Sequence, residues 1–122
     1  MAALANALVL LVAVEHVWFL VLEMFLWTRP LGLKTFRHSL EQARASAALA
    51  ANQGLYNGFL AAGLVWGLLA SPPEFAAAIK IFFLSCVVVA GVFGAATVSR
   101  RILGLQAAPA AAALLLVLYS RS

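Results

Sequence analysis

Residues 2–27 read AALANALVLLVAVEHVWFLVLEMFLW, an apolar run interrupted by three ionisable side chains. A transmembrane helix needs about 20 mostly apolar residues, because the hydrocarbon core of a bilayer is about 30 Å thick. This stretch is long enough to cross that core. It is also longer than the apolar part of a signal peptide and has no basic segment before it. It therefore predicts a membrane helix that is not cleaved off.

The composition of the whole chain supports the same interpretation. Of the 122 residues, 66% are hydrophobic and 10% are charged, whereas soluble domains average about 45–50% apolar and about 25% charged residues. A soluble domain of this size could not bury so much apolar surface. We therefore expect membrane lipids as partners. We expect no nucleic-acid partner, because most of the cations that give the net charge of +4 lie in links between apolar runs.

Three further apolar runs predict helices at residues 47–70, 79–98 and 102–119. The first link is polar and has room for a short interfacial helix, the second is a turn with two prolines, and the third is only three residues long. Such links make consecutive helices antiparallel neighbours, and Pro109 should bend the last helix. We therefore predict an all-α integral membrane four-helix bundle with up-down topology, forming a single domain over residues 1–122.

The distribution of cations predicts the orientation of this bundle. The first and third links together carry six Lys or Arg residues, whereas the opposite side carries only Lys80 and Arg121. Basic loops stay on the cytoplasmic side of a membrane. We therefore expect both termini outside the cytoplasm.

Glycines recur at four-residue spacing in the second predicted helix. They form two pairs, Gly54 with Gly58 and Gly63 with Gly67. Faces of this kind let helix backbones approach closely in lipid. They predict helix packing within the chain, and a homo-oligomer interface is the alternative.

The first predicted helix carries ionisable groups at membrane depth, where such groups are rare and are functional candidates by default. His16 and Glu23 are seven residues apart and share a helix face, which Trp27 continues, while Glu15 lies on a neighbouring face. An imidazole exchanges protons near neutral pH, and a carboxyl group can act as an acid or a base. We predict His16 and Glu23 as catalytic residues, and Glu15 and Trp27 as substrate-binding residues.

The second predicted helix contributes four polar side chains: Asn52, Gln53, Tyr56 and Asn57. From the rise of a helix, Glu23 and Asn52 both lie roughly 6–8 Å deep, and His16 and Asn57 roughly 15–17 Å deep. Gln106 of the last helix, also about 6 Å deep, could join them. We predict that these five residues bind substrate in a pocket in the cytoplasmic half of the bundle. The alternative is a paired network that only holds the helices together.

Three segments carry a resemblance to a known family. They are Leu22–Trp27 (LEMFLW), which follows His16, then Asn52–Ala62 (NQGLYNGFLAA) and Gly91–Arg100 (GVFGAATVSR). In these motifs the chain resembles bacterial inner-membrane proteins of about 120 residues that are catalogued as a domain of unknown function. The resemblance implies four membrane helices and an inner-membrane location, and it brings no established activity.

Three functions remain open for such a chain. The first is binding of a small apolar or lipid-like molecule from the bilayer, with acid–base isomerisation or cyclisation as its enzymatic form. The second is proton-coupled transport of small hydrophobic solutes, with Glu15 or Glu23 as the coupling acid. The third is a structural or accessory subunit. We predict no metal site and no cofactor, because the sequence has no zinc-type spacing and no glycine-rich phosphate loop.

Overall fold

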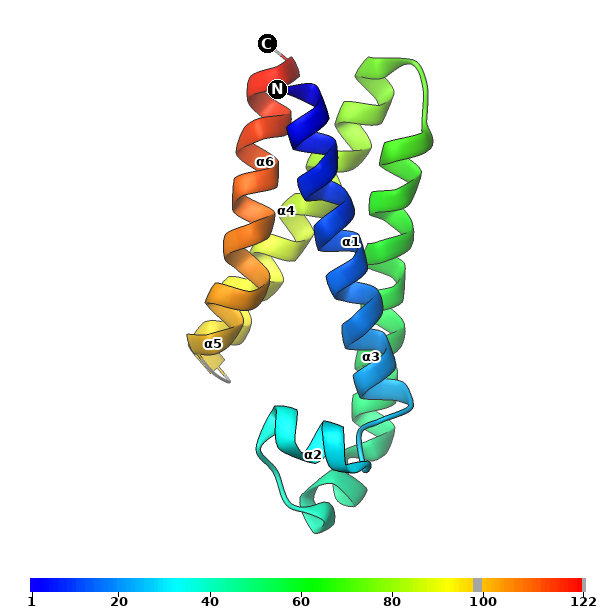
Figure 1. The fold of residues 1–122 in the computed structure, drawn as a ribbon, viewed down its shortest axis with the longest axis vertical. Helices are drawn as coiled ribbons and strands as arrows, with labels where there is room; N and C mark the ends of the chain where they lie inside the picture. Colours follow the sequence, from blue (N-terminus) through cyan, green and yellow to red (C-terminus); the bar gives the residue numbers. More distant parts are fainter. Residues whose placement is uncertain (98–99, 122) are drawn as a thin grey trace. The chain divides into compact units, whose positions relative to one another are not determined.

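The protein is all-α, as predicted, in the computed structural model, which describes residues 1–97 and 100–121 (Figure 1). In chain order its elements are α1 (Ala2–Met24), α2 (Pro30–Phe36), α3 (Leu40–Leu69), α4 (Pro73–Thr97), α5 (Arg100–Ile102), the π-helix η1 (Leu103–Ala107) and α6 (Ala108–Arg121). The described residues contain no strand.

Three helical segments of the described chain are long and apolar enough to span a membrane, namely Ala2–Met24, Pro73–Thr97 and Gly104–Arg121. Helix α3 is the longest helix described, with 30 residues, and it is not among these three. Its length is sufficient, but three side-chain amides, Asn52, Gln53 and Asn57, lower its mean hydropathy.

The chain divides into two compact units. Unit 1 consists of Met1–Ala13 and Leu60–Ser122, and unit 2 consists of Val14–Phe59. Helices α1 and α3 each run without a break from one unit into the other. The prediction of a single domain stays a prediction.

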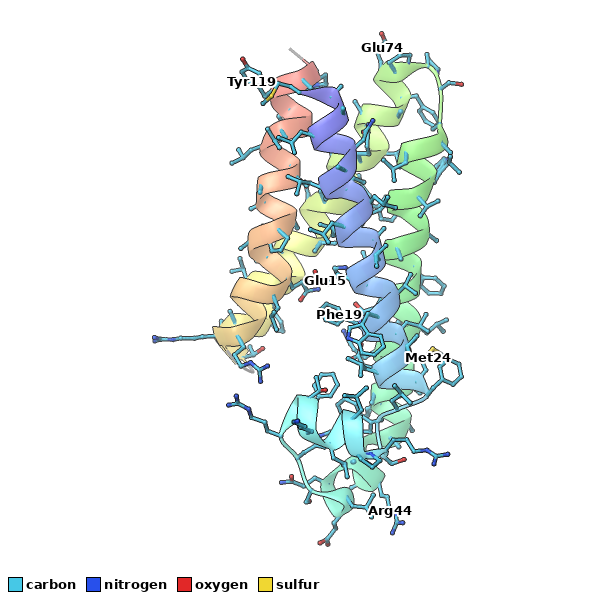
Figure 2. All side chains as sticks on the ribbon, viewed as in Figure 1. Glu15, Phe19, Met24, Arg44, Glu74 and Tyr119 are labelled. Atoms are coloured by element: carbon cyan, nitrogen blue, oxygen red, sulfur yellow. The ribbon has the colours of Figure 1, made fainter. Side chains whose placement is uncertain are left out.

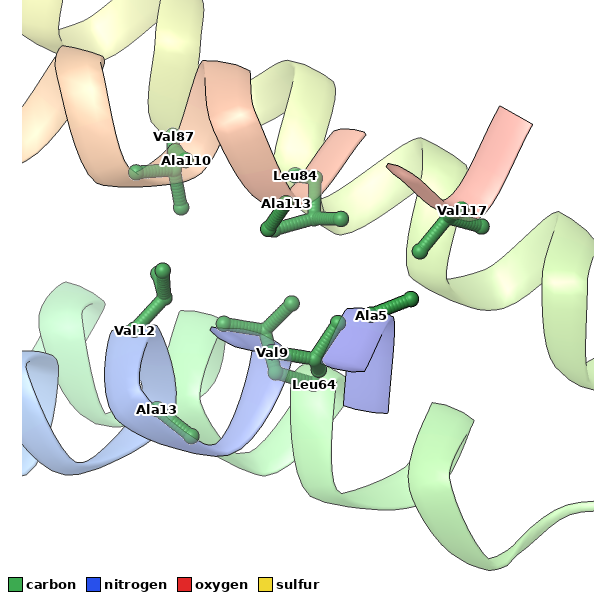
Figure 3. Close-up of a cluster of buried hydrophobic side chains, with 10 residues drawn as sticks. All are labelled: Ala5, Val9, Val12, Ala13, Leu64, Leu84, Val87, Ala110, Ala113 and Val117. Carbon is green, nitrogen blue, oxygen red and sulfur yellow. The ribbon is translucent and has the colours of Figure 1, made fainter. Parts of the chain in front are cut away.

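Unit 1 is built around a core of small and branched apolar side chains (Figure 3). The core residues come from α1, α3, α4 and α6: Ala5, Val9, Val12, Ala13, Leu64, Leu84, Val87, Ala110, Ala113 and Val117. Helices α4 and α6 pack antiparallel, since Val87 lies near Ala110 and Leu84 near Ala113 in the close-up. Small residues on α6 let the two helices approach closely, which is how helices associate in lipid.

Two helix starts differ from the predicted ones. Helix α3 begins at Leu40 rather than at residue 47, because Ser39 and Gln42 form a reciprocal capping box with hydrogen bonds of 3.1 and 3.0 Å. Helix α4 begins at Pro73 rather than at residue 79, and proline suits the first position of a helix because it has no N–H to satisfy.

The predicted ends and the predicted bend also change in detail. Helix α1 ends at Met24 rather than Trp27, since the next two amides both bond to the Val21 carbonyl oxygen and the regular ladder stops there. The predicted third span ended at Val98, which lies outside the described residues. Near Pro109 the chain forms the π-helix η1 directly before α6, because proline cannot donate the hydrogen bond that a regular turn requires.

The four glycines of α3 face other helices of the same chain. A Cβ at Gly54 would lie 2.7 Å from Cγ of Met24, and one at Gly58 would lie 2.8 Å from a methyl group of Leu20. In unit 1, a Cβ at Gly63 would clash with the Phe83 ring, and one at Gly67 would lie 2.6 Å from Cγ of Lys80. The glycines therefore serve close packing within the chain, and a homo-oligomer stays a prediction.

Candidate functional site

A polar contact joins α1 and α3 within unit 2. The side-chain amide of Asn57 donates a hydrogen bond to Oε1 of Glu23, and the two residues are 34 positions apart in the sequence. Asn57 is buried, with 5% of its surface exposed, and Glu23 is partly buried. Gly54 lies beside this contact, because a Cβ there would be 3.1 Å from Cβ of Glu23. The close approach of the two backbones at Gly54 brings the carboxyl group and the amide within bonding distance.

This pairing differs from the one that depth alone predicted, in which Glu23 lay level with Asn52. The Cα–Cβ bonds of a helix tilt towards its N-terminus. In an antiparallel pair of helices, the side chains of the two helices therefore tilt in opposite directions along the shared axis. Glu23 leans towards the start of α1 and Asn57 towards the start of α3, so the two meet although their Cα atoms lie at different heights.

His16 lies on the same face of α1 as Glu23 and is completely buried, with 0% of its surface exposed. The ring of Phe19 meets the imidazole edge to face, with 5.3 Å between the ring centroids. Leu22 of the same helix segment is also buried, at 1% exposure. The imidazole is thus enclosed on a helix whose other side chains are mostly apolar.

Glu15 lies on a neighbouring face of α1 and is partly buried (Figure 2). Its Oε1 is buried and has no hydrogen-bond partner among the residues that the structure describes. An unpaired carboxyl oxygen in an apolar setting costs free energy. A proton or a polar ligand bound to this oxygen would therefore reduce the free-energy cost of burying Glu15.

The other polar side chains of α3 lie on its open surface. Asn52, Gln53 and Tyr56 are exposed, and their side chains make no hydrogen bond within the described part of the chain. The Tyr56 ring meets that of Phe59 edge to face at 5.9 Å, and these two side chains are 53% and 54% exposed. Amides and aromatic rings together thus form one uncovered face, which we call the open face of α3 and define as these four residues.

Trp27 belongs to a different cluster, at the turn after α1. Its Nε1–H donates to Oγ of Ser46 at 3.1 Å, and its ring lies 4.5 Å from that of His38 and 4.7 Å from that of Phe36. A Cβ at Gly32 would clash with the carbonyl oxygen of Leu26, so only glycine lets α2 fold back so closely onto the end of α1. Trp27 therefore anchors the link between α1 and α3.

Sequence reasoning missed the partners of Trp27. The capping box Ser39–Gln42 was the signal that could have found one of them, because it starts α3 early enough to place Ser46 on the helix.

The predicted site residue Gln106 is partly buried in η1 of unit 1, so it belongs to the other unit. Among the described residues, no group of three His, Cys, Asp or Glu side chains could hold a metal ion.

Comparison with known proteins gives a family for this chain. Residues 10–118 match the family described as "Protein of unknown function (DUF1304)", and the chain belongs to that family. The resemblance expected from the sequence motifs is thereby confirmed. Neither the curated proteins nor the solved structures gave a match.

Proposed function

We propose that this chain is a four-span protein of the inner membrane with both termini outside the cytoplasm. Three helical segments are long and apolar enough to cross a bilayer, and they carry exposed large side chains such as Leu10, Phe82 and Leu115. Exposed apolar surface of this extent suits contact with lipid. Helix α3 would be the fourth span, because it packs along α1 through Gly54 and Gly58.

Within that membrane we propose binding of a small apolar or lipid-like molecule at the open face of α3. The observation that carries this proposal is the exposure of Asn52, Gln53 and Tyr56 in the middle of a membrane-length helix. A polar group without a hydrogen-bond partner in an apolar medium costs roughly 2–7 kcal/mol. A ligand with a polar group and an apolar body would satisfy the amides and cover the Tyr56 and Phe59 rings together.

We propose proton transfer as the chemistry at the contact between α1 and α3, on the side of α3 that carries Gly54 and faces away from Asn52 and Tyr56. Asn57 occupies one oxygen of Glu23, so the other oxygen is available to take a proton from a bound molecule or to give one. His16 on the same helix face would exchange the second proton. Removal of one proton and delivery of another leaves the atom balance of the ligand unchanged, which describes an isomerisation or a cyclisation.

A second candidate is proton-coupled transport of a small hydrophobic solute. The observation that favours it is the buried Oε1 of Glu15, which has no hydrogen-bond partner among the described residues. A carboxyl group that alternates between a proton and a solute couples the two fluxes. In this scheme the face of α1 that carries Glu15 would line the path of the solute.

The test of the binding proposal is to analyse hydrophobic molecules that copurify with the protein by chromatography and mass spectrometry. The wild type is compared with Asn52→Ala/Gln53→Ala and with a control, Leu49→Ala, which removes an exposed apolar side chain from the same helix. We expect one discrete molecule to be enriched with the wild type and the control and lost from the double variant. Equal recovery from all three would refute binding at this face.

The chemical step is tested with Glu23→Gln, which keeps the shape of the side chain but removes its acid–base function. An isomerase with this change should retain a molecule of the same mass but of different chromatographic retention, because the substrate is no longer converted. Identical retention in wild type and variant would exclude catalysis by Glu23.

Transport is tested in liposomes that contain a pH-sensitive dye and an imposed proton gradient. A transporter should carry protons when the copurified molecule is added, and Glu15→Gln should abolish that flux. Absence of flux together with absence of a bound molecule would leave a structural or accessory role.

A further inference from the structure

The ends of the three apolar segments surround a cavity of about 330 Å³ in unit 1 that has both polar and apolar lining residues. The start of α1, the start of α4 and the end of α6 line it. Its charged and polar lining residues are Asn6, Glu74, Lys80, Ser120 and Arg121. When these segments span a bilayer, their ends lie at the level of the lipid headgroups. The cavity thus opens where the polar part of a phospholipid resides.

Lys80 is held in place from two sides. Its Nζ donates a hydrogen bond to Oδ1 of Asn6 at 2.9 Å. Its stem passes over Gly67, where a Cβ would lie 2.6 Å from Cγ of Lys80. A lysine that only extends towards water from a helix end needs neither contact. The ammonium group is therefore positioned on the cavity, and it has further N–H donors to offer.

The other two charges of the cavity have no internal counter-charge. Neither Glu74 nor Arg121 forms an ion pair with any residue that the structure describes. Glu74 lies in the first turn of α4, where Figure 2 labels it, and Arg121 lies at the end of α6. Two cations and one carboxylate thus face the same space without neutralising one another.

We propose that this cavity binds the headgroup of a phospholipid with a phosphodiester and a primary ammonium group, as in phosphatidylethanolamine. The phosphate would lie between Lys80 and Arg121, and the ammonium group would bind Glu74. Lysine and arginine are the usual partners of phosphate, and each adds a charge-assisted hydrogen bond. With this headgroup, each charged side chain of the cavity faces an opposite charge. An anionic headgroup without an amine would leave Glu74 without one. The walls formed by Ala76, Ala77 and Val117 suit the start of the acyl chains.

The test is native mass spectrometry of the full chain in detergent, titrated with dioleoylphosphatidylethanolamine, dioleoylphosphatidylglycerol and dioleoylglycerol. We expect the first to bind most tightly, and Arg121→Gln to weaken its binding about fivefold, as expected for an exposed charge pair. Glu74→Gln should remove the preference for ethanolamine over glycerol. Arg44→Gln, which removes an exposed cation of unit 2, is the matched control and should change nothing.

Three outcomes would overturn the proposal. Dioleoylglycerol binding as tightly as the phospholipids would mean that no phosphate is recognised. Unchanged binding in Arg121→Gln, with a thermal unfolding midpoint equal to that of the wild type, would remove the phosphate contact. Binding of soluble phosphoethanolamine or inorganic phosphate as tightly as the lipid would identify a site for a soluble phosphate instead. Arg121 and Glu74 are exposed, so these substitutions should leave folding intact.

Discussion

Helix α1 packs by different chemistry in its two halves. In unit 1 its buried side chains are Ala5, Val9, Val12 and Ala13, and they join a core without polar atoms in its side chains. In unit 2 its buried and partly buried side chains include His16 and Glu23, and the helix bonds to α3 through a carboxyl group and an amide. The first half needs only shape to pack, whereas the second half also needs polar partners. One continuous helix thus combines a structural half with a half that carries candidate chemistry.

The largest effect should come from the core of unit 1. Leu84 is 0% exposed, and Leu84→Ala leaves a cavity in the core, so we expect a loss of about 2–4 kcal/mol in the free energy of unfolding. Leu69→Ala is the control, because Leu69 is 79% exposed and should tolerate the change. Unfolding by SDS in mixed micelles, followed by circular dichroism, measures both. Similar losses in the two variants would contradict the proposed core.

The next effect concerns the close contact between α4 and η1. A Cβ at Gly91 would lie 2.7 Å from Cβ and 2.8 Å from the backbone N of Ala107. Gly91→Ala should therefore force the two backbones apart and destabilise the protein by about 1–3 kcal/mol. Gly104→Ala is the matched control, since a Cβ there meets no other atom within 4 Å. If the same unfolding assay finds both variants equally stable, the contact does not exist in the folded protein.

A smaller effect is expected where unit 2 relies on polar contacts. A double-mutant cycle of Glu23→Ala and Asn57→Ala should give a coupling free energy of about 0.6 kcal/mol, the average for hydrogen bonds between membrane helices. The magnitude is modest because each unfolded helix finds other polar partners in the membrane. Zero coupling in the unfolding assay would show that the two side chains do not interact in the folded protein. A coupling far above 1.7 kcal/mol would mean that the pair is the main support of unit 2.

The smallest effect on stability should come from the open face of α3. Asn52→Ala and Tyr56→Phe remove groups that make no hydrogen bond within the described chain, so the free energy of unfolding should change by less than about 0.5 kcal/mol. Binding of the copurified molecule should nevertheless fall. A large loss of stability without loss of binding would mean that these residues serve packing. The contrast between a structural unit 1 and a unit 2 with candidate chemistry would then no longer hold.

The sequence predicted the helical fold because length and apolar composition are enough to define helices in lipid. The positions of helix ends depended on finer signals. Ser39 and Gln42 cap α3 as a capping box, a pattern visible in the sequence but not used for the prediction. By contrast, the end of α1 depends on how α2 folds back at Gly32. Local sequence patterns do not predict a contact of that kind.

For the candidate site, the sequence identified the residue types and their helices but not their partners. Glu23 and Asn57 were both predicted to line the site, but not to bond to each other. Their hydrogen bond follows from the tilt of the Cα–Cβ bonds and from the helix register at Gly54. A depth estimated from the rise per residue includes neither effect. Trp27 was predicted to bind substrate from its position on the face of His16 and Glu23. Its hydrogen bond with Ser46 depends instead on a turn that ends the helix before that face is complete.

The polar character of α3 has a consequence for biosynthesis. In the proposed four-span arrangement, a segment with three amides would enter the bilayer from the translocon less readily than α1 or α4. Helix α1 emerges from the ribosome first and carries in Glu23 the group that bonds to Asn57. We therefore expect α3 to integrate as a hairpin with α1 rather than alone, so that the polar pair lowers the barrier to insertion before α4 is synthesised. In that arrangement, the contact that organises the candidate site would also set the order in which the helices enter the membrane.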